Sequence, residues 1–412
     1  MLKRTEWRYF NELVVKSEVI SFASAAPSFE VISKYFGVLR NENVELLEEI
    51  GPAIFNYADI KGDESLRREL ASKGLVGENA NKDMVLITNG GQEAIKLITE
   101  TMLKKGDRVM IERLGYVGLE QTILSSGGEI RCFSDNLNKL KLSEIEQELR
   151  KSKPKLVYLI PDFSNPCGDN LREDVRKLMV KLATKLSFWV IEDQTYREIY
   201  FDKNEHLASM FSRSDKVIIV GSISKIIVPG LRIGWLVTKD DLLRQKITQL
   251  KESFTLSTNN LSQKLIARLL ETEYEKMIRW VRNYYGKKMK KTLENLEKNI
   301  PERFSFSKPR GGFYIWIEGP EGFQAKKTLN LALGNGIGFM PGGVFYYNNK
   351  KANTFRLSIS AIKEKDIKDG IDRLTKTLEG KKLLIKKNIG WKGKIKEFIL
   401  NLHHRLQLMF VR

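Results

Sequence analysis

The sequence Gly-Ser-Ile-Ser-Lys at residues 221–225, followed at once by Pro-Gly-Leu-Arg-Ile-Gly at 229–234, is the most informative stretch of this chain. Lysine is the side chain that condenses with an aldehyde, and serine hydroxyls and arginine are good donors to a phosphate. Lys225, with these neighbours, can therefore form a Schiff base beside a bound phosphate. A surface lysine after the apolar run 217–220 is the plain alternative, which this short segment alone leaves open.

Short apolar runs bounded by turn residues lie on both sides of this stretch and alternate with helical patterns. They predict strands at residues 84–88, 108–112, 155–160, 188–192, 217–220 and 232–238. Strands separated by helices are typical of α/β crossovers, which build a mostly parallel sheet between helices. We therefore expect an α/β fold whose ligands bind beyond the carboxyl ends of these strands.

The pattern changes after this large unit. Residues 240–298 read as helical, and strands around 314–317 and 354–358 precede a helix at 364–378, which indicates a smaller α+β domain. The domains that we expect are an N-terminal arm with part of the small domain at 1–50, a large coenzyme-binding domain at 51–285, a small C-terminal domain at 286–380 and a tail at 381–412.

The tail at 381–412 combines clustered lysines with apolar residues at helical spacing. A basic amphipathic helix of this kind can lie on an anionic membrane or dock on a partner. The alternative is a terminal helix that packs its apolar stripe on its own domain, and we favour it.

The composition is that of a folded protein from a reducing compartment. The chain has 412 residues, 42% of them hydrophobic, which is enough for a large core in more than one unit. Two cysteines, Cys132 and Cys167, make no disulfide framework. No run is long enough to span a bilayer, and no signal peptide is evident. We expect a soluble, cytoplasmic protein.

The histidine content and the charge narrow the chemistry. Only three histidines occur, His206, His403 and His404, which excludes Ser-His-Asp triads and multi-histidine zinc sites, so we expect no metal. The formal net charge of +19 can indicate nucleic acid or an anionic membrane, or equally a lysine-rich surface. No DNA-reading motif accompanies it, so we expect no nucleic-acid partner.

Pyridoxal phosphate matches these constraints, and the chain has a candidate for each contact that it needs. Besides a lysine for its aldehyde, it needs N–H donors at a helix start for its phosphate and a carboxylate for its pyridine nitrogen. Asn-Gly-Gly-Gln at 89–92 joins a predicted strand to a predicted helix, and its glycines let a phosphate approach the helix start. An ordinary strand-to-helix turn is the alternative.

Asp193 ends the apolar strand at 188–192, where a carboxylate is costly without a cation such as a protonated pyridine. Tyr196 can donate to the ring oxygen of the coenzyme, and so can Asn165, which Pro166 fixes in place. The alternatives are that Asp193 caps the next segment and that Asn165 belongs to a simple Asn-Pro turn.

Three further residues are weaker candidates. Tyr116 follows the strand at 108–112 and can stack on the ring of the coenzyme, and Tyr57 precedes a predicted turn at Gly62. Arg356 alternates with apolar neighbours on its strand and can hold a substrate carboxylate with two hydrogen bonds. A core aromatic, a turn aromatic and a surface ion pair are the respective alternatives for Tyr116, Tyr57 and Arg356.

In this order, the motifs resemble the class I and II, fold type I, pyridoxal-phosphate-dependent aminotransferases over about residues 20–380. The resemblance is strongest to the branch that holds the 2-aminoadipate and kynurenine-type aminotransferases and the catalytic domains of MocR-type regulators. Its most specific parts are Tyr57 with Gly62 and Leu66-Arg67, Asn165 to Gly168, Asp193 with Tyr196, Ser222 to Lys225 with Pro229 to Arg232, Gly311 to Phe313, and Phe355 to Ser358.

The resemblance implies a role for each residue. Lys225 carries the coenzyme and moves the proton at the substrate's α-carbon, and Asp193 pairs with the pyridine nitrogen. Tyr196 and Asn165 bond the ring oxygen, and Tyr116 stacks on the ring. The groups implied to hold the phosphate are Gly91, Gln92, Ser222, Ser224, Arg232 and Tyr57 from a second subunit, which makes a homodimer part of the site. Those implied to bind the substrate α-carboxylate are Arg356 and Asn165, with Ala25 nearby.

The chain departs from the family pattern at three places. Ala25 stands where glycine is usual, Cys167 where threonine is common, and Leu114-Gly115 where Pro-Thr is usual. None of these removes a catalytic group, but Ala25 and Gly115 line the substrate side and bear on specificity. We expect the apolar residues of the segment 20–40, namely Phe22, Phe29, Ile32 and Phe36, to favour an apolar or aromatic amino donor.

The leading hypothesis is an aminotransferase of amino-acid metabolism, in a biosynthetic process. It moves an amino group from an aromatic, aliphatic or 2-aminoadipate-like L-amino acid to a 2-oxo acid, 2-oxoglutarate by our expectation, through a ping-pong mechanism. Another pyridoxal phosphate reaction, such as β-elimination or decarboxylation, is the alternative on the same fold. A binding protein without turnover and a nucleic-acid-binding protein are the alternatives of other classes.

Overall fold

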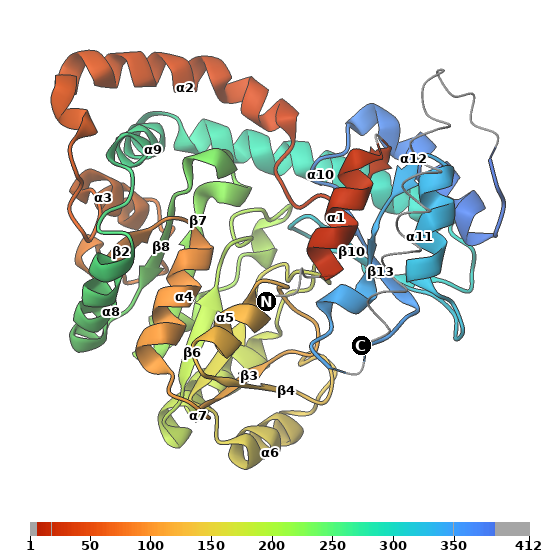
Figure 1. Ribbon diagram of the computed structural model, residues 1–412, viewed down its shortest axis with the longest axis horizontal. Helices are drawn as coiled ribbons and strands as arrows, with labels where there is room; N and C mark the ends of the chain where they lie inside the picture. The colour runs from red at the N-terminus through yellow and green to blue at the C-terminus, as the bar shows by residue number, and fades with distance from the viewer. Residues whose placement is uncertain (1–5, 18, 349, 384–412) are drawn as a thin grey trace, which may run out of the picture.

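A seven-stranded sheet forms the centre of the computed structural model, which describes residues 6–17, 19–348 and 350–383 (Figure 1). The strand order is β2-β8-β7-β6-β5-β3-β4, and only β8 runs antiparallel to its neighbours. The strands are β2 (Val85–Thr88), β3 (Arg108–Ile111), β4 (Glu129–Cys132), β5 (Leu156–Leu159), β6 (Trp189–Asp193), β7 (Val217–Ser222) and β8 (Gly234–Val237). The predicted α/β fold with a mostly parallel sheet is confirmed.

The apolar strands arise because both faces of this sheet are buried. On β5, Leu156 and Tyr158 pack into one hydrophobic core, whereas Val157 and Leu159 pack into a second core on the opposite face. A strand covered on both sides needs apolar residues at every position rather than in alternation. The helices around the sheet are α4 (Gly91–Met102), α5 (Leu119–Ser125), α6 (Leu142–Ser152), α7 (Glu173–Leu186) and α8 (Asp241–Phe254) (Figure 1).

A smaller antiparallel sheet, in the order β12-β13-β10-β9, forms a second unit. Its strands are β9 (Ser305–Phe306), β10 (Tyr314–Glu318), β12 (Met340–Pro341) and β13 (Thr354–Ser358), and its helices are α11 (Ala325–Gly334) and α12 (Ile367–Leu378). The N-terminal part of the chain packs here, because β1 (Ile20–Ser21) pairs with β11 (Ile337–Gly338) and α1 (Glu6–Lys16) contacts β12.

Long helices join and extend the two units. The predicted helical stretch after residue 240 contains α8, α9 (Asn260–Thr272) and α10 (Tyr274–Asn299), and α10 runs from the large unit to the small one (Figure 1). The helix α2 (Phe29–Ile50) crosses the edge of the molecule above α9 and α10, and α3 (Glu64–Ser72) packs on α9. The side chains of Phe29 and Phe36 on α2 are 78% and 61% exposed.

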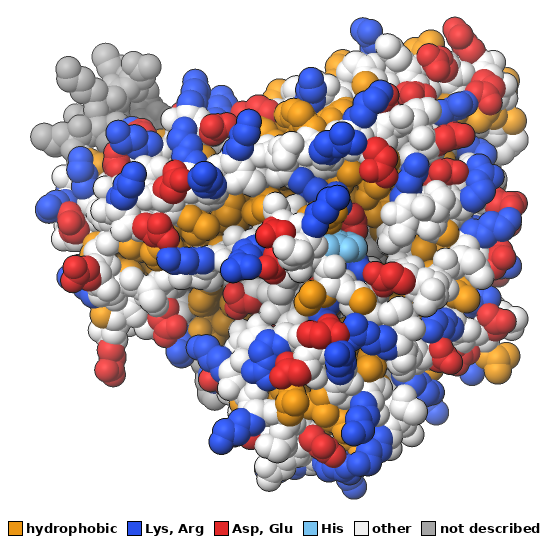
Figure 2. All heavy atoms as spheres, turned by 180° about the vertical axis from the view of Figure 1, so that it is seen from behind, with side chains coloured by type: hydrophobic (Ala, Val, Ile, Leu, Met, Phe, Trp, Pro, Cys, Tyr) orange, Lys and Arg blue, Asp and Glu red, His pale blue; other side chains and the backbone are white. Residues whose placement is uncertain are grey.

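Positive charge is spread over the face of the molecule that Figure 2 shows. On the face seen in Figure 2, Lys and Arg side chains alternate with Asp and Glu side chains rather than gathering in one patch. Within the described ranges, no helix combines the length and the apolar character needed to cross a bilayer. Most of the predicted basic tail, residues 384–412, lies outside the described residues.

Candidate active site

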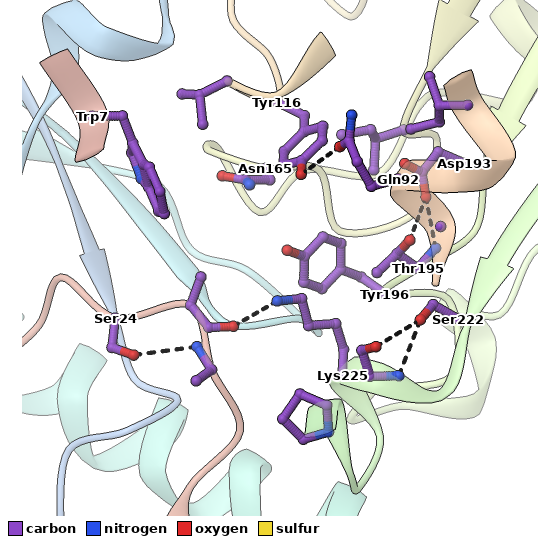
Figure 3. Close-up of a pocket in the computed structure, with 18 of the residues that line it drawn as sticks. Trp7, Ser24, Gln92, Tyr116, Asn165, Asp193, Thr195, Tyr196, Ser222 and Lys225 are labelled. Atoms are coloured by element: carbon purple, nitrogen blue, oxygen red, sulfur yellow. Dashed lines mark hydrogen bonds between the residues drawn. The ribbon is translucent and has the colours of Figure 1, made fainter. Parts of the chain in front are cut away.

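A cavity of about 380 Å³ lies where the carboxyl ends of β6 and β7 face the small unit (Figure 3). Every site residue predicted from the sequence except Tyr57 lines it, namely Ala25, Gly91, Gln92, Tyr116, Asn165, Asp193, Tyr196, Ser222, Ser224, Lys225, Arg232 and Arg356. Strand ends meet at one edge of a parallel sheet, which is why segments far apart in the sequence converge here.

The amine of Lys225 projects into this cavity. The residue ends a short 3₁₀ turn, Ile223–Lys225, that follows β7 directly, and its Nζ donates to the backbone oxygen of Ala25 at 2.8 Å (Figure 3). Burial, and then the nearby cations Arg356 and Arg232, lower the pKa of Lys225 to about 8, while Asp193 opposes the shift. Lys225 is therefore no ordinary surface lysine, because much of it is neutral near pH 8.

Asp193 lies buried at the end of β6 and is held from two sides. Its Oδ1 accepts hydrogen bonds from the backbone N–H and the hydroxyl of Thr195, at 3.0 and 2.5 Å, and its Oδ2 accepts from the Tyr158 hydroxyl at 2.6 Å. Burial nevertheless keeps the pKa of Asp193 above its ordinary value, although these donors lower it. A buried carboxylate of this kind is stabilised by a cation that enters the cavity.

An anion site lies at the start of α4. No side chain caps this helix, whose N-cap residue Gly90 has a φ of 85°, and dipole and free N–H groups at such a start favour an anion. The Arg232 guanidinium approaches so closely that a Cβ at Gly90 would clash with it. Ser222 donates to Ser224 Oγ at 2.9 Å beside them. These groups form a cradle for a phosphate.

Arg356 is 1% exposed on β13 and has no carboxylate partner among the residues that the structure describes. One guanidinium nitrogen donates to Asn165 Oδ1 at 2.8 Å and another to the Ala23 oxygen at 2.9 Å, whereas Nε is buried without a partner. Burial lowers the pKa of Arg356. Because its oxygen is taken by Arg356, Asn165 keeps its NH₂ group to donate into the cavity.

Two tyrosines line the wall on either side of these groups. The Tyr116 hydroxyl donates to Gln92 Oε1 at 2.8 Å, and burial raises the pKa of Tyr116 to about 12 (Figure 3). The hydroxyls of Tyr196 and Tyr314 lie 2.7 Å apart. Both cavity tyrosines are therefore neutral hydrogen-bonding groups near neutral pH.

A model of the family described as aminotransferase class I and II matches residues 17–374. The chain belongs to the class I and II aminotransferases. It is 30% identical over 374 residues to the 2-aminoadipate transaminase of Thermus thermophilus, a match that covers 90% of this chain and 92% of that protein. It is 31% identical over 387 residues to the aromatic-amino-acid aminotransferase 1 of Thermococcus litoralis, which covers 92% of each.

Solved structures agree with this assignment. The kynurenine aminotransferase of Pyrococcus horikoshii, solved with PMP, superposes with a TM-score of 0.85 at 31% identity and covers 92% of this chain and 95% of that one. Proteins named HTH-type transcriptional regulators, from Bacillus subtilis, also match. The predicted family and branch are confirmed, and the protein is an aminotransferase that uses pyridoxal phosphate.

The cavity of this aminotransferase fits that coenzyme. The uncapped start of α4 and Arg232 suit the phosphate, Asp193 suits a protonated ring nitrogen, and Lys225 suits the aldehyde. Among the described residues, no cluster of three or more His, Cys, Asp and Glu side chains suits a metal ion.

Several residues of the site went unnoticed in the sequence. The Tyr158 hydroxyl and the Thr195 backbone N–H donate to Asp193, and the Ala25 backbone oxygen accepts from Lys225. Contacts through the backbone do not depend on the residue type, so the sequence gives no signal for those of Thr195 and Ala25. Trp7 and Asn11 of α1 also line the cavity. Phe29 and Phe36 do not line the cavity of the single chain and are largely exposed, so their effect on the choice of amino donor stays a prediction.

Tyr57 is the predicted site residue that the chain does not bring to the cavity. Its side chain is 84% exposed, on the segment after the 3₁₀ turn Gly51–Phe55. The alternative role of Asp193, as a cap of the segment that follows it, agrees with one contact: the Thr195 N–H donates to the Asp193 carboxylate.

Proposed function

We propose that this aminotransferase moves the amino group of an aromatic, aliphatic or 2-aminoadipate-like L-amino acid to a 2-oxo acid, with 2-oxoglutarate as the acceptor. The observation that carries the proposal is Arg356, a buried guanidinium beside the Lys225 amine and without a carboxylate of its own among the described side chains. An isolated buried charge is costly, so a carboxylate ligand has much to gain there. Amino acids and 2-oxo acids share the carboxylate that this group binds.

Arg356 and Asn165 would orient the substrate. With Asn165 and the Ala23 oxygen fixing two of its nitrogens, the guanidinium cannot turn, and a carboxylate bound to it points the α-carbon in one direction. Ala25 lies next to this place and is tied to Lys225 through its backbone oxygen.

Lys225 would move the proton. Pyridoxal phosphate, when bound, supplies an aldehyde that takes up the amino group and a ring that withdraws electrons from the α-carbon. With a pKa of about 8, the Lys225 amine can accept a proton from that carbon and return it at no great cost near neutral pH. Asp193 holds the positive charge of the ring, and Tyr196, Asn165 and Tyr116 donate to the coenzyme or cover it.

The phosphate would be bound by the amides of Gly91 and Gln92, by Ser222 and Ser224, and by Arg232. Tyr57 would complete this set from a second subunit. Its exposure supports the proposal, as do the exposed apolar side chains of Phe55, at 72%, and Phe254, at 58%, which a homodimer would cover.

We place the enzyme in the cytoplasm, because Cys132 and Cys167 are free thiols. Its similarity to a 2-aminoadipate transaminase supports a place in amino-acid metabolism, which we propose to be biosynthetic. The proposed domains are the arm at 1–50, the large domain at 51–285 and the small domain at 286–380. Contact of the tail at 381–412 with a membrane or partner remains a separate hypothesis.

The test is a screen of amino donors with 2-oxoglutarate, in which glutamate is measured. Wild type and Lys246→Ala, a change of an exposed lysine on α8, should form glutamate with at least one donor, whereas Lys225→Ala should form none. Omission of the oxo acid should stop turnover, because transamination needs an acceptor, whereas β-elimination or decarboxylation would continue without one. Equal glutamate formation by Lys225→Ala, or none by wild type with any donor, would contradict the proposal.

A further inference from the structure

Two side chains of α1 line the cavity and have no part in the coenzyme site. Trp7 and Asn11 are four residues apart, so they lie on one face of the helix. Figure 3 shows the Trp7 indole projecting into the cavity, across from the Lys225 side chain. This helix precedes the segment 20–40, where we expected the substrate side chain to be recognised.

The helix α1 is firmly attached to the small unit. Leu13 and Val14, near the C-terminal end of α1, are buried, and Val14 packs so closely on Gly338 of β11 that a Cβ there would lie 2.5 Å from it. Glu6 at the start of α1 forms an ion pair with Lys350 at 2.9 Å. Trp7 therefore reaches the cavity from a supported position, which is what a recognition side chain requires.

The charges on the cavity wall limit the substrate side chain. The described lining residues include three cations, Lys225, Arg232 and Arg356, and a single carboxylate, Asp193. The coenzyme and the α-carboxylate engage all four under the proposed function. A donor with a second carboxylate would gain no further ion pair on this wall, and a basic side chain would face no remaining carboxylate. The second carboxylate of 2-oxoglutarate would likewise bind without an ion pair to the described lining residues. The rest of the wall near Trp7 includes Ala25, Ala26, Val117 and Ile160.

We propose that Trp7 is a specificity-determining residue that binds an uncharged aromatic or large aliphatic side chain of the amino donor. The inference rests on the proposed function, since it takes Arg356 as the α-carboxylate site. An indole offers a large apolar face and favourable ring–ring geometry to such a side chain. Asn11, whose amide bonds to no residue that the structure describes, supplies one neutral polar group beside it.

The test measures binding rather than turnover. Two unreactive carboxylates, 3-phenylpropionate and glutarate, are titrated into the coenzyme-loaded enzyme by calorimetry. Wild type should bind 3-phenylpropionate at least about tenfold more tightly than glutarate, because burial of an aromatic ring outweighs a second carboxylate without a cation. Trp7→Ala should lose about thirtyfold in affinity for 3-phenylpropionate and less than about threefold for glutarate.

Two variants serve as controls. Trp7→Phe should recover most of the affinity for 3-phenylpropionate, and Val15→Ala, which changes a side chain 64% exposed on the same helix, should bind both probes as wild type does. The inference is overturned if wild type prefers glutarate or binds neither probe, or if Trp7→Ala weakens both equally or neither. Failure of the proposed function looks different, since wild type would then form no glutamate while the two probes still bind as predicted.

Discussion

Tyr158→Phe should weaken the hold of the enzyme on its coenzyme, in a way that depends on pH. The change removes the 2.6 Å hydrogen bond from the Tyr158 hydroxyl to Asp193 Oδ2 and leaves the rest of a buried ring in place. A hydrogen bond to a charged group contributes about 2 kcal/mol, so its loss should raise the pKa of Asp193 further. That pKa already lies above its ordinary value because of burial.

The sign follows from which form of Asp193 binds. A protonated pyridine pairs with the ionised carboxylate. When the pKa of Asp193 in the free enzyme is higher, more of this carboxyl is protonated as the pH falls, and it must lose its proton before the coenzyme binds, which weakens binding. The dissociation constant of pyridoxal phosphate should therefore be near that of wild type at high pH. It should become weaker by up to about thirtyfold at low pH, where Asp193 is protonated before binding.

Tyr274→Phe is the matched control. Its hydroxyl donates to Glu198 at 3.1 Å, so this variant also loses a bond between tyrosine and a largely buried carboxylate, but Tyr274 does not line the cavity. Both variants should lose similar free energy of unfolding in urea. Coenzyme dissociation constants, measured by absorbance titration from pH 6 to 9, should change in Tyr158→Phe only. An unchanged constant at pH 6 would refute this account of Asp193.

Three further predictions concern the other walls of the cavity. Arg356→Gln should raise KM for both amino acid and oxo acid about a hundredfold, because a lost charge pair of about 3 kcal/mol is expected, while the amount of coenzyme bound per subunit stays unchanged. Gly90→Ala should weaken coenzyme binding, because its Cβ meets the Arg232 guanidinium at a φ of 85°, whereas Gly37→Ala, with open space around it on α2, should not. The rate at which the coenzyme-free enzyme takes up pyridoxal phosphate should rise about fivefold from pH 7 to 8 and level off above about pH 9, because only the neutral Lys225 amine reacts and its pKa is about 8. The same pKa predicts an effect on stability. Because it lies below the ordinary 10.5, the free energy of unfolding should increase as the pH rises from about 8 towards 10.5, which urea titrations at each pH would detect.

The fold was predictable because burial on both faces of the sheet leaves a continuous apolar signature. Strands β5, β6 and β7 are such runs. Asn165, Asp193 and Lys225 are polar side chains at or just beyond the ends of these strands, where a parallel sheet gathers its ligands. The short strands of two residues, β1 and β11 among them, carry too few residues for any period to show.

The substrate side of the cavity was not predictable in the same way. Whether the apolar residues of α2 face the cavity depends on how the helix docks, and Phe36 projects to the outside. Trp7 belongs to a helix whose buried face, Phe10 with Leu13 and Val14, predicts a helix but not the surface that it covers. Tyr158 sits within an apolar strand, where its hydroxyl looks like one more core aromatic until the neighbouring β6 places Asp193 beside it.

The most direct measurement is the site at which the coenzyme attaches. The purified enzyme, loaded with pyridoxal phosphate, is reduced with borohydride, digested and mapped by mass spectrometry, with Lys225→Ala treated in parallel. Wild type should carry the reduced coenzyme on the peptide that contains Lys225, and the variant should carry none at any lysine. Attachment at another lysine, or no attachment in wild type, would contradict the account.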